Sequence, residues 1–257
     1  MNYYEHRQYS DQELLARVMA KEEIKNLMAR RAFYYANNQR QRELDELWVS
    51  TEEYAKTASY GRNWGYYVGM DSIRNYYVAE HERKQREALE ALGQPDQAPG
   101  WGCTAFHETT TPMLYISGDG KTARGLWYVP GQETIMGQDG SAGCYWTMDN
   151  MSADFVLENG AWKLWHLVVC SDFFVEAGTD FQTGTLDPLT GPDPFRDEFG
   201  TPDIPMAVHN PRYNLGDNYP AMPLPYETYT TEGSLSPEGH PRRPDGYYKF
   251  MKEGIQK

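Results

Sequence analysis

His107 is the residue of this chain whose type and position best suit chemistry. It stands before a segment rich in aromatic and β-branched residues, which ends in the turn signal Ser-Gly-Asp-Gly at 117–120. We therefore expect it at the mouth of a β-hairpin, where an imidazole with an unperturbed pKa of about 6.5 could exchange protons near neutral pH. The alternative is a structural histidine, hydrogen-bonded at the end of a strand.

Glu133 is a second residue that could move a proton. It lies just past the predicted strand 122–129, in a segment over 130–143 that we expect to be irregular. As a carboxylate lid over a pocket, within reach of His107, a desolvated glutamate could work as an acid or a base near pH 7. The alternative is an exposed carboxylate in a loop.

Aromatic residues make up 14% of the chain, with 20 Tyr and 7 Trp, and such side chains fill cores, line pockets for flat ligands and build subunit interfaces. His166 lies in the predicted last strand and faces either the pocket or a structural partner. Asp149 and Asp154 are weaker carboxylate candidates, and we expect Asp154 to hold the last hairpin together. The predicted pocket wall consists of Tyr34, Tyr60, Trp64, Tyr67, Trp101, Trp127, Tyr128, Tyr145 and Trp146.

The elements that must position these residues begin with a helix. Ser10 and Glu13 have the spacing of a capping box, and apolar residues then recur at helical spacing up to the stop signal Asn37-Asn38, with a bend or a junction near 20–21. A short helix is predicted around 44–48 and a weak strand pair within 54–67.

A second long helix is predicted from Asp71 to the stop at Gly93. After the hairpin that follows His107, a last hairpin joins 153–158 to 162–174 through Asn159-Gly160, which is the strongest short hairpin signal.

The chain changes in composition near residue 179. Twelve of its 16 prolines lie beyond that point, and this density excludes regular helix and interior strand. Aromatic residues recur through the same stretch, so we expect an ordered, extended arm rather than a disordered tail. The predicted organisation is a core domain over 1–178 and an arm over 179–257. The arm would embrace a second subunit of a homodimer or higher homo-oligomer; alternatively, it would close its own pocket with Tyr213 or His209.

The net charge of −13, without a long basic cluster, argues against nucleic acid and anionic membranes as partners. No apolar run approaches the length of a membrane span, and the N-terminus lacks a signal-peptide core, so a cytoplasmic protein is expected. The three cysteines, Cys103, Cys144 and Cys170, have neither disulfide nor zinc spacing.

Helices followed by long antiparallel strands that end in Trp-Lys-Leu-Trp-His resemble the SnoaL-like branch of the nuclear transport factor 2-like superfamily, over roughly residues 12–176. The matching segments are 24–48, 69–73, 107–112, 118–123 and 154–166. The resemblance implies an α+β fold, in which a curved antiparallel sheet packed with N-terminal helices forms a cone around the ligand pocket. Members of this family include dehydratases, aldol-type cyclases, isomerases, cofactor-free lyases and binding proteins.

The resemblance also implies a role for His107, because bile-acid and scytalone dehydratases use the equivalent histidine with an Asp and a Tyr from the first helix. At and near those helix positions, this chain has Arg31, Ala36, Tyr34, Tyr35 and Asn37. We expect Tyr35 to take a catalytic part beside His107 and Glu133, and Asn37 to contact the substrate.

The function expected from these features is a cofactor-independent lyase or dehydratase. It would act on an aromatic or polycyclic small molecule, such as a lignin-derived, polyphenolic or steroid-like compound, by acid/base catalysis centred on His107. The alternatives are a ketosteroid-type isomerase and a non-catalytic ligand-binding or assembly module. Because the chain has no Gly-rich phosphate loop and no metal-ligand spacing, we expect neither an organic cofactor nor a metal.

Overall fold

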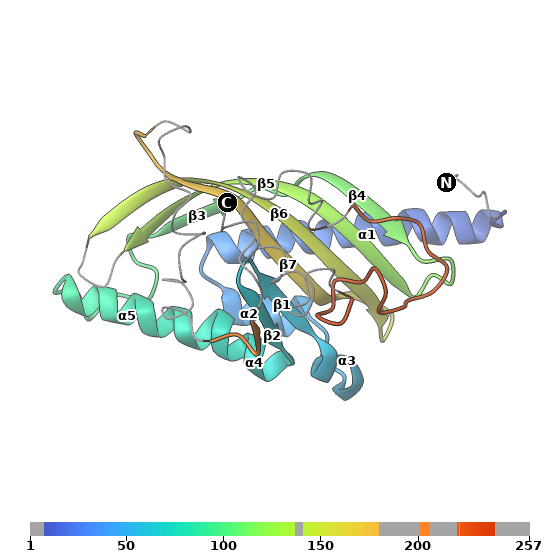
Figure 1. Ribbon diagram of the computed structural model, residues 1–257, viewed down its shortest axis with the longest axis horizontal. Coiled ribbons are helices and arrows are strands. Elements are labelled where there is room, and N and C mark those ends of the chain that lie inside the picture. The colour runs from blue at the N-terminus through green and yellow to red at the C-terminus, as the bar shows by residue number, and fades with distance from the viewer. Residues whose placement is uncertain (1–7, 137–140, 180–200, 206–219, 221, 240–257) are drawn as a thin grey trace, which may run out of the picture.

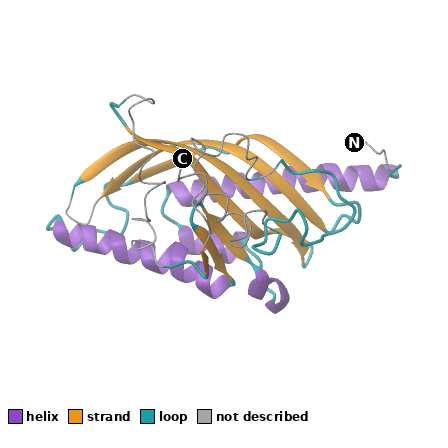
Figure 2. Cartoon of the chain, in the orientation of Figure 1, coloured by secondary structure: helices purple, strands orange, loops and turns teal. Residues whose placement is uncertain are grey.

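A computed structural model describes residues 8–136, 141–179, 201–205, 220 and 222–239. They form the predicted α+β fold, with one sheet in the strand order β3-β5-β6-β7-β1-β2-β8 and with β4 also paired to β5. The strands are β1 Ser59–Arg62, β2 Gly65–Val68, β3 Thr104–His107, β4 Thr110–Ile116, β5 Thr122–Met136, β6 Ala142–Glu158, β7 Ala161–Glu176 and β8 Ile204–Pro205. Figures 1 and 2 show the long strands arching across the molecule, with the helices beneath the arch.

The first helix, α1, runs without interruption over Asp11–Ala36, so the bend considered near 20–21 is absent. Its capping box is present as predicted: the Ser10 hydroxyl accepts from the Glu13 N–H at 3.3 Å, and the Glu13 carboxylate accepts from the Ser10 N–H at 2.8 Å. Two short helices follow, α2 over Arg40–Leu47 and α3 over Glu52–Thr57.

The second long helix is not regular. It starts as α4 over Met70–Arg74, widens into a π-helical stretch over Asn75–Glu80, and continues as α5 over His81–Ala91. Such π-helical segments are rare and often occur at functional sites. Here the stretch turns the adjacent side chains of Tyr76 and Tyr77 toward the same cavity.

The last two long strands, β6 and β7, are joined at Asn159 and Gly160, whose φ angles are 51° and 80°. A two-residue turn with both angles positive matches the twist of the flanking strands, which confirms the hairpin predicted from Asn-Gly.

The segment 130–143 was expected to be irregular, and this expectation is wrong for its described part, because β5 continues through Pro130 to Met136 and β6 begins at Ala142. A proline has no N–H for a ladder. However, Pro130 lies where β5 changes partner from β4 to β3, and its carbonyl accepts from the N–H of Glu108 at 3.0 Å. Glu133 therefore belongs to a strand rather than to a lid.

The core lies between the concave face of the sheet and the helices. Its largest fully buried side chains include Met28, Trp48, Tyr77, Trp127 and Phe155. None of the helices in the described part of the chain combines the length and the apolar content needed to cross a membrane.

Part of the C-terminal segment packs on its own domain. Residues 222–239 lie beside the β4–β5 turn, where the N–H of Gly118 donates to the Tyr226 carbonyl at 2.8 Å, and Arg124 donates to the Thr230 carbonyl at 3.1 Å. Residues 201–205 of the arm are also described, and Ile204–Pro205 pairs with β2 as β8. Tyr213 and His209 lie outside the described residues. The embrace of a second subunit stays a prediction.

Asp154 joins this segment to the sheet. Its carboxylate contacts His166 Nδ1 at 2.9 Å and Arg124 Nε at 3.4 Å, and it accepts from the N–H of Leu235 at 2.8 Å. His166 also contacts the carbonyl of Thr57 through Nε2 at 3.2 Å. Asp154 therefore holds the last hairpin, as expected, and His166 is engaged on both ring nitrogens.

We predict that a chain ending at Gly178 unfolds at a temperature lower by at least about 5 °C, because Arg124 and Asp154 lose partners and several hydrogen bonds are broken. A chain ending at Gly239 keeps these contacts and serves as the control. Thermal unfolding of both, with the mass in solution measured in parallel, also tests the predicted embrace. Equal midpoints for the two shortened chains and the full chain would contradict this role of the segment.

Candidate active site

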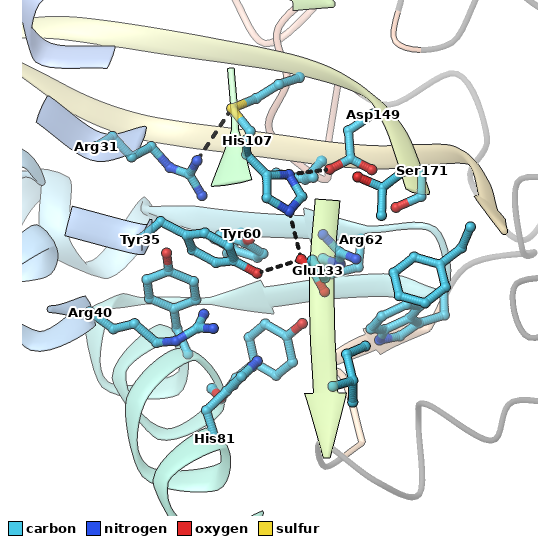
Figure 3. A pocket seen from close by; sticks show the side chains of 18 residues that line it. Arg31, Tyr35, Arg40, Tyr60, Arg62, His81, His107, Glu133, Asp149 and Ser171 are labelled. Carbon is cyan, nitrogen blue, oxygen red and sulfur yellow. Dashed lines mark hydrogen bonds and ion pairs between the residues drawn. The ribbon is translucent and has the colours of Figure 1, made fainter. Parts of the chain in front are cut away.

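A cavity of about 100 Å³ lies between the concave face of the sheet and the helices (Figure 3). Helices α1 and α2, the π-helical stretch and strands β1, β3, β5, β6 and β7 all contribute side chains. The lining consists of Arg31, Tyr35, Arg40, Tyr60, Arg62, Trp64, Tyr76, Tyr77, His81, His107, Glu133, Ile135, Thr147, Asp149, Met151, Val169, Ser171 and Phe174.

The register of three strands brings His107 and two carboxylates to the same face. His107 on β3 pairs with Gly131 on β5, and Gly131 pairs with Thr147 on β6. Side chains two residues apart in a strand share a face. Glu133 therefore lies on one side of the histidine and Asp149 on the other.

Gly131 leaves room for the histidine ring to reach across β5. A Cβ at this position would lie 2.5 Å from the hydroxyl of Thr147, 2.7 Å from the carbonyl of Phe106 and 3.2 Å from Nδ1 of His107. Of these three neighbours, the Phe106 carbonyl belongs to the backbone and is the least able to move away from a new side chain. The missing side chain therefore lets an imidazole on β3 contact a carboxylate two strands away.

The imidazole of His107 has one carboxylate at each ring nitrogen, and these three side chains form the array (Figure 3). His107 Nε2 is 2.6 Å from Glu133 Oε1, and His107 Nδ1 is 3.2 Å from Asp149 Oδ2. The hydroxyl of Tyr35 donates to the same Oε1 of Glu133 at 3.1 Å, and its ring meets the imidazole edge to face at 5.1 Å.

This array fixes the charge of the imidazole. Burial by itself lowers the pKa of His107, but the hydrogen bonds and charges of Asp149 and Glu133 outweigh it and raise the pKa to about 9. Burial raises the carboxylate pKa values, yet the contact with His107 lowers both below their usual range. At neutral pH, the site therefore holds an imidazolium between two carboxylates.

Three arginines also line the cavity. Arg31 is neutralised by Glu43, with 3.1 Å between Nε and Oε1, and Glu43 accepts a further hydrogen bond from Tyr77 at 2.6 Å. Nε and Nη1 of Arg40 and Nε of Arg62 are buried without a hydrogen-bond partner among the described residues.

A second cavity of about 150 Å³ adjoins the first. The two cavities share the lining residues Tyr35, Arg40, His81, Glu133 and Ile135. Burial lowers the pKa of His81 well below its usual value, with the charge of Arg40 acting in the same direction. This second histidine is therefore neutral at pH 7.

Several of the predicted site residues lie together. His107, Glu133 and Tyr35 are in direct contact, and Tyr60 and Trp64 line the same cavity. Asp149, named as a weaker candidate, is the second carboxylate of the array.

Other predicted wall residues lie elsewhere. Tyr128 and Trp146 have an exposed fraction of 49% and 48%, because the alternation of strand side chains sends them to the outer face, and Trp101 is exposed in the loop before β3. The remaining five do not line the cavity. Tyr67 stacks on Tyr76, which does line it. The other four contact residues outside the lining: Tyr34 with Glu46, Asn37 with the Phe33 carbonyl, Trp127 with Phe155, and His166 with Asp154. Tyr145 stacks on Phe174, which lines the cavity.

The sequence reasoning missed Arg40, Arg62 and His81. Arg40 begins the short helix α2, and Arg62 ends a four-residue strand, so no pattern of spacing marked either of them. His81 follows a π-helical stretch that has no recognised sequence signal. In the described residues, no group of three or more His, Cys, Asp or Glu has the arrangement of a metal site. The expectation of no cofactor stays a prediction.

Comparison with known proteins gives a family match and a set of fold neighbours. The SnoaL-like domain matches residues 16–168, which is more than half of the chain. No curated protein matches the sequence.

Among solved structures, LinA-type3, a hexachlorocyclohexane dehydrochlorinase from Novosphingobium barchaimii LL02, is 15% identical, with 65% of this chain and 97% of that chain covered and a TM-score of 0.45. A putative scytalone dehydratase from Novosphingobium aromaticivorans is 11% identical, with 64% and 92% covered and a TM-score of 0.41. An NTF2-like protein with a cystatin-like fold from the same species is 16% identical, with 68% and 96% covered and a TM-score of 0.42. At such identities, the activities of these neighbours do not transfer to this chain.

We predict that Gly131→Ala disrupts the site, because the new Cβ collides with the Phe106 carbonyl and pushes the imidazole off Asp149. The substitution should lower the free energy of unfolding by about 1–3 kcal/mol. Gly143→Ala on β6 is the matched control, since the three atoms nearest to its Cβ all belong to the movable end of Tyr145. Urea unfolding measures both variants, and equal stabilities would contradict the packing described for Gly131.

We also predict a pH dependence of stability that comes from His107. Its pKa is raised on folding, so its contribution is complete below about pH 6.5 and is lost as the pH rises through about 9. At about 1.4 kcal/mol per pKa unit, the loss amounts to about 3 kcal/mol.

Urea unfolding between pH 6 and 10 should show this loss in the wild-type chain, and the difference between wild type and His107→Gln isolates it from the other histidines. A difference that stays constant over this range would contradict the ion-paired imidazolium.

Proposed function

The chain belongs to the SnoaL-like domain family, and on this basis we propose that its cavity is the active site of a cofactor-independent lyase or dehydratase. The observation that carries the proposal is the buried array of Glu133, His107 and Asp149 beside the Tyr35 hydroxyl. Buried titratable groups with shifted pKa values that line a cavity are the usual sign of acid/base catalysis.

The proton of His107 decides which group acts as the base. An imidazolium with a pKa near 9 has no lone pair to accept a proton at neutral pH, so the proposal departs from proton abstraction by His107. Glu133 is the better base. Its Oε1 accepts hydrogen bonds from His107 and Tyr35, and its Oε2 accepts none from the described residues, so Oε2 can take a proton from the substrate.

In a dehydration, Glu133 would take a proton from a carbon of the substrate, and the electron pair of that C–H bond would form the new C=C bond. Once Glu133 is protonated and neutral, it no longer attracts the proton at His107 Nε2 as a carboxylate does. This proton can then pass to the departing hydroxyl of the substrate, so that water leaves. Protonated Glu133 would return its proton to the neutral imidazole over the 2.6 Å contact, and the array is restored.

The size of the cavity limits what reacts there. An apolar cavity of about 150 Å³ accommodates benzene. A space of about 100 Å³ therefore suits a reacting fragment no larger than a single ring, and the adjoining 150 Å³ would take the remainder of a larger aromatic substrate. Tyr60, Trp64 and Tyr77 supply flat walls, which supports an aromatic substrate.

Isomerisation is the second candidate, because the same carboxylate could move a proton between two carbons. A binding module is less well supported, since the cavity is not filled by its own tyrosines and contains the charged array. A cytoplasmic location and the homo-oligomer remain part of the proposal.

We predict that the purified full chain, without added cofactor, converts members of a pool of aromatic alcohols. Mass spectrometry distinguishes the reactions: loss of water indicates a dehydratase, loss of a small carbonyl fragment a lyase, and unchanged mass with a new absorption spectrum an isomerase.

For the substrate found in this way, Glu133→Gln and His107→Gln should each lower kcat by about 10²- to 10⁴-fold, and Tyr35→Phe should lower it less. Glu53→Gln, an exposed carboxylate on α3, is the control and should leave kcat unchanged. Turnover at the wild-type rate in Glu133→Gln would contradict the proposed base.

A further inference from the structure

The cavity contains more positive charge than its own carboxylates neutralise. The imidazolium of His107 and the carboxylates of Glu133 and Asp149 sum to one negative charge. Arg31 is paired with Glu43, but Arg40 and Arg62 add two positive charges, which leaves the group with one net positive charge. Buried charges are normally paired, so an excess of this kind calls for a partner.

Arg40 is the least compensated of these arginines. Its guanidinium lies over aromatic rings, with Cζ 4.4 Å from the centre of the Tyr35 ring and 5.0 Å from that of Tyr77. The neighbours that shift its pKa are Tyr35, Tyr77 and Tyr60, which are uncharged at neutral pH, whereas Asp149 is among the neighbours of Arg62. Rings in these positions hold the guanidinium in place by cation–π attraction and leave its Nε and Nη1 without an acceptor.

The unused donors point to an acceptor that the protein does not supply. Nε and Nη1 of Arg40 and Nε of Arg62 are buried without a hydrogen-bond partner among the described residues. Burying a donor without an acceptor costs free energy, and a hydrogen bond from a guanidinium to an anionic oxygen is charge-assisted. Figure 3 shows that both side chains reach this one cavity from different elements, α2 and β1.

We propose that the ligand of this cavity carries an anionic oxygen group, a carboxylate or a phenolate, that accepts hydrogen bonds from Arg40 and has Arg62 as its second positive neighbour. This proposal specifies the substrate class of the site and rests on the proposed function only in taking the same cavity as the active site. A single negative charge on the ligand offsets the single excess positive charge of the cavity.

The position of Arg40 also orients the ligand. Arg40 lines both the inner cavity and the adjoining one, together with Glu133. An anionic group held there lies at the junction of the two spaces. The part of the ligand that enters the inner cavity then lies beside Glu133, the proposed base.

The test is equilibrium binding, measured by calorimetry, with two pairs of probes that differ mainly in charge. Benzoate is compared with benzamide, and 4-nitrophenolate with 4-nitroanisole. All are measured at one pH at which benzoic acid and 4-nitrophenol are both ionised. We expect at least one anion to bind at least about tenfold more tightly than its neutral counterpart. The pair that shows the difference tells whether the site prefers a carboxylate or a phenolate. Equal affinities within both pairs would overturn the proposal.

Variants then assign the contact. Arg40→Gln should raise the Kd of the preferred anion by about 10- to 100-fold and leave that of its neutral counterpart unchanged. Arg40→Lys should fall in between, because it keeps the charge and loses the planar set of N–H donors. Arg42→Gln is the matched control: this arginine lies two residues along on α2, and its Nε contacts Glu46 at 2.6 Å. Unchanged anion affinity in Arg40→Gln would overturn the role of Arg40.

The two proposals fail separately. Anion binding that depends on Arg40, without turnover of any compound, would keep this inference and remove the proposed function. Turnover of neutral compounds at the same rate in wild type and Arg40→Gln would keep the function and remove the inference.

Discussion

The ion-paired contact of His107 with Glu133 and Asp149 is the interaction on which the arrangement of this site depends. Each of these groups would be costly to bury alone, and together they are tolerated because each satisfies another. Three features of the fold make this contact possible. β5 runs through Pro130 instead of ending there, β3 pairs beyond it, and Gly131 leaves open the path of the imidazole.

The same contact shapes the chemistry of the cavity. Because both ring nitrogens contact carboxylates, the imidazole is protonated at neutral pH and cannot act as a general base. The carboxylate that shares this proton, Glu133, takes over that part, and Tyr35 orients it. Bile-acid and scytalone dehydratases pair their histidine with an aspartate from the first helix, whereas here the strands β5 and β6 supply the carboxylates. The positive charge of Arg40 and Arg62 favours a ligand with an anionic group, a preference that the array alone would not produce.

Much of the fold could be predicted from local signals. The capping box at Ser10 and the Asn159-Gly160 turn each rest on short-range physics, and the structure contains both. The sequence also gave reason to single out His107, Glu133 and Tyr35, although Glu133 was assigned to a loop. The rest depends on long-range register. Only the pairing of three strands shows that Asp149 faces His107 and that Tyr128 and Trp146 face outward. No sequence pattern marked Arg40 or Arg62, because only the folded cavity shows that their buried N–H groups lack an acceptor among the described residues.

The charge state of His107 is the central claim, and NMR titration of the chain with labelled histidine measures it directly. The account predicts that the His107 ring stays protonated through neutral pH and titrates near 9, and that Glu133→Gln lowers this value. A His107 ring that titrates at or below about 6.5 in the wild-type chain would contradict the account, because the array would then hold a neutral imidazole.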